Sequence, residues 1–409
     1  MVSCMNTDAT IGARIRELRE RAGLQSQELA AALGIDPSAI SNIEKGKRAV
    51  KTTELAVIAS TIGVSPLAIL SPESPVSQLP VAARATDSEG SVGTVVARLN
   101  ALTDLHHLLL DSGCELANGS SLDEVPEVDI EHWLASADRL AQWARESLLP
   151  PSDGAQPDRF TKLAEAIERN LGVDVMVEGF PAREVLGACI TDRRWPFILV
   201  NRGQPITRAL FTLAHELGHV LSGEGKESIT LDVTLTQHTK EEMFANAFAA
   251  SFLMPSSSVQ ELIDKFGVTS KALASMVSLF GVSFESLIYR LHNLGKISAA
   301  TRDQLQSLGW PAVLQDLGTE DRRRALARQG MQPERRPPGL LTVRTHAAYE
   351  AGIVSVRPLA SLLDVNPDEL IDLYVRERDS QEAWSGNVTN ETGVDPSSSD
   401  EDRYSGVPA

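Results

Sequence analysis

Residues 208–220 read RALFTLAHELGHV, an apolar run that contains two histidines and one glutamate. The run predicts a buried helix, because apolar residues occupy most of its length. Four residues turn an α-helix by about 400°, so His215 and His219 project from one face, one turn apart. Two imidazoles at that spacing can share one tetrahedral Zn²⁺. The stretch therefore predicts one zinc ion per chain, held by His215 and His219, with Glu216 as the base that deprotonates water.

A catalytic zinc usually has three protein ligands and an open position for water. Glu242, 23 residues after His219 in the stretch KEEMFANAFAASFLMP, is the predicted third ligand. Alanines on the same helical stripe would let this second helix approach the first, and Asn246, one turn further on, would hydrogen-bond a ligand. Two alternatives stay open. Glu241 is an alternative ligand, about 100° away around the helix, and His238 is a ligand, a donor to the transition state or an exposed loop residue.

Residues 11–70 contain a pattern of five short predicted helices. The second covers residues 26–33 and ends on Gly34, a common C-terminal stop. Asp36 and Pro37 then form the N-cap and the first residue of a third helix. Two helices joined by a tight glycine turn, with another helix in front, are the helix-turn-helix arrangement.

The charge of the chain is unevenly distributed. The net charge of the whole chain is −17, which disfavours nucleic acid as a partner because phosphates are negatively charged. Residues 11–70, however, carry eight basic and six acidic side chains, whereas residues 379–409 carry one basic and seven acidic ones. A basic N-terminal region in an otherwise acidic chain can bind DNA through one face.

The string ELAAALGIDPSAISNIEKGKRAVKTTELAVIASTIGVSPLAIL at 28–70 is similar to the Cro/C1-type (XRE) helix-turn-helix family along its full length. The resemblance implies that the third helix lies in the major groove of a double-stranded DNA operator, near base edges and phosphates. The family's usual glutamine in the second helix aligns with Ser26, so Gln25 or Gln27 would substitute for it. The alternative is a packing module without DNA binding. The implied DNA-binding residues are Gln27, Ser38, Ser41, Asn42, Lys45, Lys47 and Arg48.

Three segments resemble, in order, the ImmA/IrrE family of metallopeptidases across about residues 158–295. They are R-x-x-F-T-x-A-H-E-L-G-H from Arg208, E-x-x-A-N-x-F-A from Glu242, and L-M-P at 253–255. The resemblance implies a gluzincin-like zinc metalloendopeptidase, and many members of that family cleave or inactivate a repressor. It implies zinc ligands His215, His219 and Glu242, with Glu216 as general base. The donor to the oxyanion stays open among His238, Tyr289 and Arg208.

The fold class is predicted to be mainly α with a small antiparallel sheet. Runs of β-branched residues at 173–177, 185–190 and 197–200 predict strands, directly before the long helix that begins near Thr207. Stretches rich in proline, serine and glycine predict the breaks between domains. The predicted domains are a five-helix helix-turn-helix domain at 1–70, a linker at 71–95, a helical insert at 96–148, an α+β zincin-like metallopeptidase domain at 158–295, a C-terminal helical region at 296–378 and a disordered acidic tail at 379–409.

The predicted function is a cytoplasmic DNA-binding transcriptional regulator whose zinc-dependent endopeptidase domain cleaves or inactivates a repressor or an antitoxin-type partner. The alternative is a transcription factor without hydrolysis, whose metallopeptidase fold senses zinc or a partner. A homodimer is expected, because such DNA readers usually bind paired half-sites. No membrane association is expected, because no stretch approaches the roughly 18 consecutive apolar residues of a membrane span.

The pattern L-A-x-x-L-x-[IV]-[DN]-P-x-x-[IL] occurs at Leu29–Ile40 and again at Leu359–Leu370. The second occurrence is either a further DNA-contacting unit or a helical hairpin that packs along one apolar seam. No basic cluster like the one at 45–48 follows Leu370, which favours a hairpin that forms an interaction or dimer surface.

Overall fold

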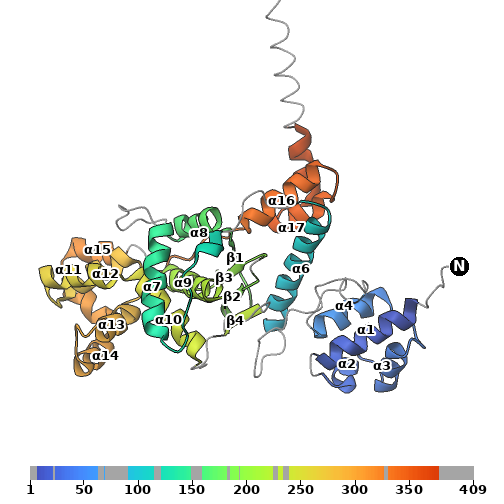
Figure 1. Ribbon diagram of the computed structural model, residues 1–409, viewed down its shortest axis with the longest axis horizontal. Helices are drawn as coiled ribbons and strands as arrows, with labels where there is room; N and C mark the ends of the chain where they lie inside the picture. The colour runs from blue at the N-terminus through green and yellow to red at the C-terminus, as the bar shows by residue number, and fades with distance from the viewer. Residues whose placement is uncertain are drawn as a thin grey trace, which may run out of the picture. The chain divides into compact units, whose positions relative to one another are not determined.

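Figure 1 shows the computed structural model, which describes residues 7–21, 24–62, 69, 91–114, 121–148, 159–181, 185–192, 194–223, 229–233, 239–326 and 330–376. The fold is mainly helical with one small sheet, as predicted. The chain divides into two compact units, Met1–Ala348 and Tyr349–Ala409. Residues 71–90 of the predicted linker and the predicted tail at 379–409 lie outside the described residues, and helix α6 already begins at Ser91.

The N-terminal helical domain consists of α1 (Thr7–Arg21), α2 (Ser26–Leu33), α3 (Pro37–Glu44) and α4 (Thr52–Ile62). Gly34 ends α2 in the left-handed conformation, with φ 63°. Asp36 caps α3, because its carboxylate accepts a hydrogen bond from the backbone N–H of Ser38 at 2.8 Å. The predicted helix-turn-helix is therefore present, and of the fifth predicted helix only Ile69 is described. The buried core of this domain comprises Ile15, Leu18, Leu29, Ala30, Ile40, Ile43, Leu55, Ile58, Ala59, Ile62 and Ile69.

The sheet has four strands in the order β1-β3-β2-β4, with bounds Asp174–Glu178 (β1), Val185–Ile190 (β2), Phe197–Asn201 (β3) and Ile229–Val233 (β4). β2 is antiparallel to both β3 and β4, but β1 and β3 are parallel. The predicted small sheet is therefore present and is antiparallel at two of its three strand pairs, whereas the parallel β1–β3 pair and β4 were not predicted. The parallel pair follows from the topology, because β3 inserts between β1 and β2. Since β2 runs opposite to β1 and β3 turns back from β2, β3 must run with β1.

Helices surround the sheet in layers. α9 (Ile206–Ser222) packs on β2 and β3, α10 (Lys240–Leu253) packs on α9, and α7 (Trp133–Leu148) packs on α10 (Figure 1). Their apolar faces, with that of α8 (Arg159–Leu171), belong to one core. The remaining elements of this unit are α6 (Ser91–Asp111), the 3₁₀ helix η2 (Ser121–Glu124), α11 (Ser256–Phe266), α12 (Ser270–Phe280), α13 (Phe284–Asn293), α14 (Ala299–Gln315) and α15 (Thr319–Leu326).

No helix in the described ranges is by itself long and apolar enough to cross a membrane. Among the described helices, α12 and α13 taken together satisfy the length and composition of a span, but they meet at a bend of 105°.

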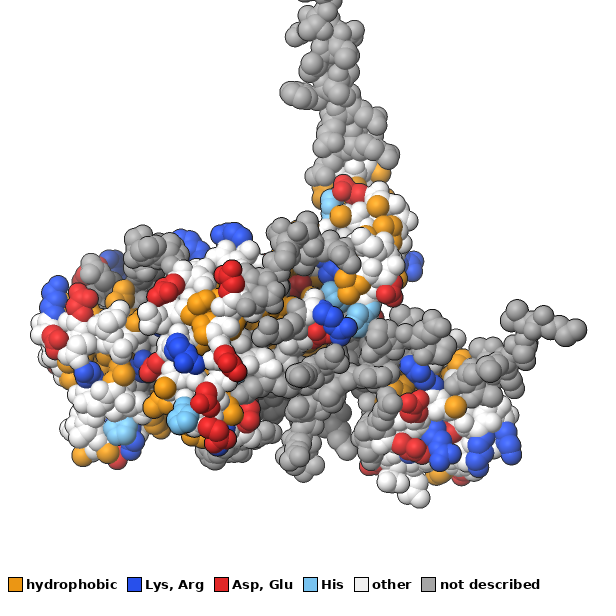
Figure 2. Space-filling model, viewed as in Figure 1, with side chains coloured by type: hydrophobic (Ala, Val, Ile, Leu, Met, Phe, Trp, Pro, Cys, Tyr) orange, Lys and Arg blue, Asp and Glu red, His pale blue; other side chains and the backbone are white. Residues whose placement is uncertain are grey.

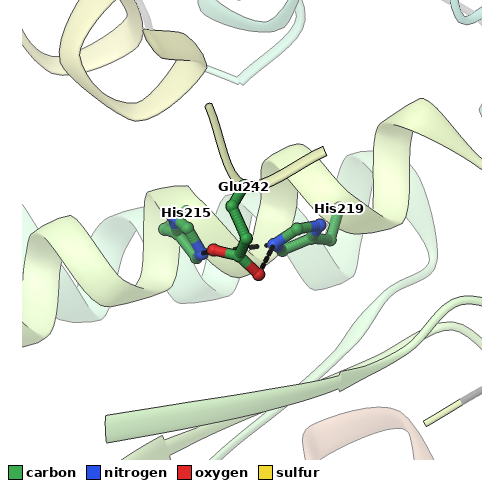
Figure 3. A group of neighbouring side chains, drawn as sticks. All are labelled: His215, His219 and Glu242. Atoms are coloured by element: carbon green, nitrogen blue, oxygen red, sulfur yellow. Dashed lines mark hydrogen bonds and ion pairs between the residues drawn. The ribbon is translucent and has the colours of Figure 1, made fainter. Parts of the chain in front are cut away.

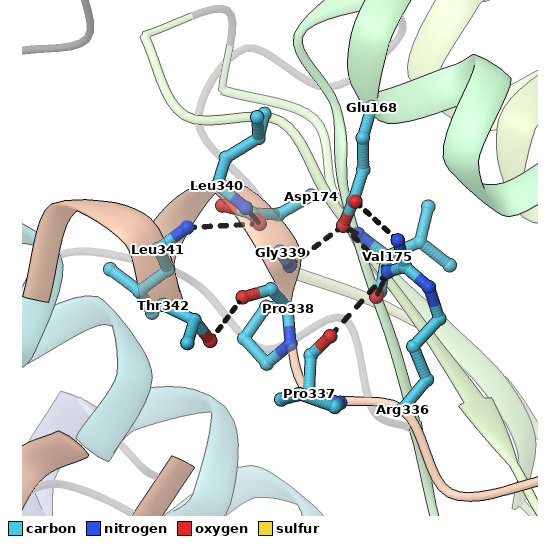
Figure 4. A network of polar contacts seen from close by, with 10 residues as sticks. All are labelled: Glu168, Asp174, Val175, Arg336, Pro337, Pro338, Gly339, Leu340, Leu341 and Thr342. Atoms are coloured by element: carbon cyan, nitrogen blue, oxygen red, sulfur yellow. Dashed lines mark hydrogen bonds and ion pairs between the residues drawn. The ribbon is translucent and has the colours of Figure 1, made fainter. Parts of the chain in front are cut away.

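The segment around Arg336, directly before α16, covers the β1 edge of the sheet. The backbone of Arg336 exchanges two hydrogen bonds with that of Val177, at 2.8 and 3.0 Å. The Arg336 guanidinium forms an ion pair with the Glu168 carboxylate of α8 (Figure 4). Glu168 also accepts a hydrogen bond from the N–H of Gly339 at 2.8 Å. This segment therefore occupies backbone groups that an open sheet edge would leave unpaired.

Asp174, the first residue of β1, caps the helix that follows this segment, α16 (Gly339–Glu350). Its Oδ1 accepts hydrogen bonds from the backbone N–H groups of Leu340 at 2.9 Å and Leu341 at 3.2 Å (Figure 4). Its Oδ2 accepts one from the indole of Trp195 at 3.0 Å. Burial raises the pKa of Asp174 to about 6, and the nearby Glu168 carboxylate also raises it. A carboxylate in this position satisfies amides that the first turn of a helix cannot pair internally.

The second unit contains the end of α16, helix α17 (Val356–Leu363) and a helical segment at 367–376. Its small core comprises Val356, Leu359, Ala360 and Leu370, with Tyr349, Leu363 and Tyr374 packed against them.

Candidate metal centre and DNA-contact surface

The helix α9 holds the two predicted histidine ligands and the predicted base inside the core that it shares with α7, α8 and α10. His215 is 4% exposed, His219 is 5% exposed and Glu216 is completely buried. The Glu216 side chain lies over Gly187 of β2, where an added Cβ would stand 2.6 Å from Glu216 Oε1. Glycine at this position in the strand therefore provides the space that the carboxylate occupies.

The structure brings the three predicted ligands together (Figure 3). His215 Nε2 and His219 Nε2 are 3.2 Å apart. Glu242 lies on α10. Its Oε2 is 3.3 Å from His215 Nε2, and its Oε1 is 3.4 Å from His219 Nε2. One ligand atom from each of the three residues lies within 4.8 Å of the others.

This donor set fits zinc. Two neutral imidazole nitrogens and a carboxylate are ligands that catalytic zinc sites use. Atoms bound at about 2.0–2.1 Å in tetrahedral geometry lie about 3.3 Å from one another. The observed separations of 3.2, 3.3 and 3.4 Å agree with that spacing. Among the described residues, this is the group of histidine, cysteine and acidic side chains that could hold a metal ion.

The charge state of Glu242 suits a ligand. Burial alone raises the pKa of its carboxyl, but without metal the hydrogen bonds and charges of protonated His215 and His219 outweigh burial and hold the pKa well below its ordinary value. The carboxylate is therefore ionised, which is the form that binds a metal.

A close approach of α10 to α9 makes the convergence possible. A Cβ added at Gly218 of α9 would lie 3.0 Å from the ring of Phe248 and 3.2 Å from the Cα of Ala245, both in α10. Thr239 caps α10 and accepts a hydrogen bond from the N–H of Glu242 at 3.3 Å, which fixes the first turn that carries the ligand. Small residues on both helices thus allow Glu242 to reach the histidines.

α7, part of the predicted helical insert, supports α10 from the other side. Arg145 of α7 donates to the backbone carbonyl of Ser251 at 2.6 Å. The Ser251 hydroxyl in turn donates to Asp138 of α7. The insert therefore helps to position the helix that carries Glu242.

The other predicted residues are exposed or lie outside the described residues. Asn246 is exposed, and among the described residues its side chain makes no hydrogen bond to a predicted ligand. Glu241 is exposed on the solvent side of α10, and Arg208 and Tyr289 are also exposed. His238 lies outside the described residues.

Sequence reasoning missed Gly187 and Gly218, which create the space for Glu216 and for α10. Each is a glycine inside a strand or a helix, where glycine costs stability. An isolated glycine of that kind often marks a close approach, and this signal was available in the sequence.

The predicted DNA contacts lie mainly on the surface of the N-terminal helical domain. Ser41 and Arg48 are half-buried. Figure 2 shows lysine and arginine side chains gathered on this domain, at the lower right. The exposed predicted contacts are Gln27, Ser38, Asn42, Lys45 and Lys47.

Three of the described basic residues of this domain, Arg16, Arg19 and Arg48, form ion pairs within it. Arg48 donates to Glu54 at 2.6 Å, so its guanidinium is already engaged by α4. Arg19 donates to Glu44 at 2.6 Å and links α1 to the end of α3. The buried Arg19–Glu44 pair holds α3 in place, and Lys45 and Lys47 remain exposed beside it.

Two family models match the chain: the helix-turn-helix family at residues 15–69 and the IrrE N-terminal-like domain at residues 168–292. Two relatives, each named radiation response metalloprotease IrrE, come from Deinococcus radiodurans and Deinococcus deserti. Each is 33% identical over 99 residues, a stretch that covers 23% of this chain and 30% and 35% of the respective relatives. The match therefore spans about a third of the length of each relative. Residues 15–69 are therefore similar to the XRE-type helix-turn-helix family and residues 168–292 to the IrrE/ImmA-like metallopeptidases, as the motifs predicted.

Proposed function

We propose that this protein is a DNA-binding transcriptional regulator whose metallopeptidase domain is a zinc-dependent endopeptidase. The observation that carries the proposal is the convergence of His215, His219 and Glu242 within 4.8 Å beside the buried Glu216. A structural zinc site would use all four positions for protein ligands, whereas three ligands leave a position for substrate or water. The presence of a helix-turn-helix domain in the same chain supports the regulatory part.

The proposed mechanism assigns a separate task to each residue. His215, His219 and Glu242 would hold the zinc, which would supply a Lewis acid for the peptide carbonyl and for water. Glu216 is the general base: its carboxylate takes a proton from the attacking water and passes it to the leaving amine.

We infer that the substrate is a protein, a repressor or an antitoxin-type regulator, because a DNA reader would bring the peptidase to partners bound near the same operator. Double-stranded DNA would be contacted by side chains of α2 and α3, with Lys45 and Lys47 on phosphates. Both activities require the compartment that holds the DNA, so we propose a cytoplasmic protein.

The decisive variant is Glu216→Gln, which keeps the size of the side chain and removes the base. We expect it to bind as much zinc as wild type and to cleave at least about 100-fold more slowly. The substrate is found by comparing protein N-termini in cells that express either form, and cleavage is then measured with the purified substrate. A Glu216→Gln protein that cleaves as fast as wild type would contradict the proposed mechanism.

A third strain that expresses Asn42→Ala, compared with these two, distinguishes the alternative, a transcription factor without hydrolysis. In that case Asn42→Ala abolishes regulation, while Glu216→Gln leaves regulation unchanged and no protein N-terminus depends on Glu216.

A further inference from the structure

β2 contains a β-bulge directly before Gly187, the residue over which the proposed base lies. Val185 of β2 pairs with Val233 of β4. Gly187 pairs with the adjacent Asp232, so Leu186 is an extra residue that has no counterpart in β4. A bulge bends its strand and disrupts the pairing locally, and bulges are frequent beside active sites, where they redirect a side chain.

Two buried side chains bind the backbone carbonyls at this bulge. The Gln204 amide donates to the carbonyl of Leu186 at 2.9 Å. The Asn201 amide donates to the carbonyl of Val185 at 2.8 Å. Asn201 ends β3, Gln204 lies in the turn that leads to α9, and each is 4% exposed. These side chains supply hydrogen-bond partners where the strand pairing is irregular, and a buried carbonyl without a partner would cost stability.

Gln204 also binds α9 itself. Its second amide N–H donates to the carbonyl of Asn201 at 2.9 Å, and its oxygen accepts a hydrogen bond from the Thr212 hydroxyl at 3.1 Å. Thr212 is 3% exposed and lies one helical turn before Glu216, on the same face of α9. Gln204 therefore joins the bulged strand to the face of the helix that carries the base.

Thr212 and Glu216 lie against the same point of β2. A Cβ added at Gly187 would stand 2.6 Å from the Thr212 methyl and 2.6 Å from Glu216 Oε1. Because residue 187 has no side chain, the separation of strand and helix sets where the completely buried Glu216 carboxylate lies. A base must be within hydrogen-bond reach of the proton that it takes, and a displacement of about 1 Å can cost about 100-fold in rate.

We propose that Gln204 is a positioning residue for the peptidase reaction. By binding Leu186 of the bulge and Thr212 of α9 together, it fixes the place of the Glu216 carboxylate beside the metal ligands. A buried hydrogen-bond network whose groups are all satisfied is held in one geometry, which suits this task. The inference rests on the proposed function and adds to it a residue that acts only through Glu216.

The test compares variants that remove or keep the hydrogen bond between Gln204 and Thr212. Gln204→Met keeps a side chain of similar length, Thr212→Val keeps the shape of threonine, and Thr212→Ser keeps the hydroxyl. Thr345→Val is the matched control, because the Thr345 hydroxyl is also buried in a helix, α16, and donates to the carbonyl of Leu341 at 2.7 Å. Circular dichroism and zinc content check that each variant folds and binds metal.

The first readout is the affinity of the zinc-loaded proteins for acetohydroxamic acid, measured by calorimetry. A hydroxamic acid binds zinc as its anion and gives its proton to a base beside the metal, so its affinity depends on where the Glu216 carboxylate lies. We expect Glu216→Gln to raise the dissociation constant at least about tenfold, because a hydrogen bond to a charged group is lost. Gln204→Met and Thr212→Val should each raise it at least about fivefold, and Thr212→Ser and Thr345→Val should stay within about twofold of wild type. Wild-type affinity in Gln204→Met or Thr212→Val, or a larger loss in Thr212→Ser than in Thr212→Val, overturns the proposal.

Urea unfolding of the metal-free proteins gives a second readout that needs neither zinc nor hydrolysis. Gln204→Met and Thr212→Val remove the same hydrogen bond, so the double variant should lose less free energy of unfolding than the sum of the two single losses. Additive losses overturn the link between the bulge and α9. A wild type that binds no zinc would contradict the proposed function, whereas additive losses contradict the role of Gln204, so the two failures are distinguishable.

Discussion

Glu241 and Glu242 are neighbours in the chain and both lie in the first turn of α10, yet only Glu242 reaches the histidines. The 100° between successive residues of a helix turns one carboxylate toward α9 and the other toward solvent. Both carboxylates interact favourably with the N-terminus of the helix, so their removal has a similar effect on helix stability. Glu241 is therefore a matched control for the proposed ligand.

We expect Glu242→Ala to lose zinc and Glu241→Ala to retain it. Wild type and Glu241→Ala should contain about one zinc per chain, and Glu242→Ala should contain less than about a tenth of that, because one of three ligands is absent. Elemental mass spectrometry of the purified proteins measures this directly, and circular dichroism checks that both variants fold. Equal zinc in the two variants would show that Glu242 is not a ligand.

At the scale of elements, the segment leading to α16 is fastened to the sheet by two buried acidic residues. Glu168 pairs with Arg336, and Asp174 caps the helix. The pKa of Asp174 is raised to about 6 from an ordinary value of 3.8, mainly by burial. A raised carboxyl pKa means that the folded state binds the proton more tightly than the unfolded state. The contribution of protonated Asp174 to the free energy of unfolding is therefore at its full value below about pH 3.8, and it is lost as pH rises through 6.

We therefore expect the stability of wild type relative to Asp174→Asn to fall as pH rises from 4.5 to 7.5. Asparagine keeps an acceptor oxygen for the amides of α16 but does not ionise. The decrease should be on the order of 1–3 kcal/mol, since one pKa unit corresponds to about 1.4 kcal/mol. Urea unfolding followed by tryptophan fluorescence at several pH values measures it. A difference that does not change with pH would show that Asp174 does not titrate as its burial requires.

At the scale of the whole molecule, the N-terminal helix-turn-helix domain and the candidate metal centre have separate hydrophobic cores. The core of the N-terminal domain comprises buried residues between Ile15 and Ile69, whereas α9 and α10 belong to the core that begins at Leu122. Among the described residues the two cores have no member in common. This separation agrees with the match of two independent family models to the chain.

We accordingly expect removal of metal to leave DNA affinity within about twofold of its starting value. A double-stranded fragment selected in vitro from a random library serves as the probe, and fluorescence anisotropy measures its binding before and after chelation. Lys47→Ala provides the positive control, because loss of a phosphate contact should weaken binding and reduce the salt dependence. A large loss of affinity on chelation would show that the metal site controls the reader.

The sequence by itself determined the features that depend on neighbouring residues. The bounds of α2, its left-handed end at Gly34 and the cap at Asp36 follow from interactions within about four residues. The placement of His215 and His219 on one face follows from the pitch of a single helix. Such local signals identified both families and the mainly helical fold.

Only the tertiary structure decided the features that join distant segments. It brought Glu242 to the histidines, laid Glu216 over Gly187, paired β1 with β3 in parallel and fastened Arg336 to Glu168. Each depends on which surfaces pack together, because side chains far apart in sequence become neighbours only when the core excludes water between them. The parallel β1–β3 pair was not predicted for the same reason: strand order is set by the crossing of the chain over the sheet, which the alternation of residues within one strand does not encode.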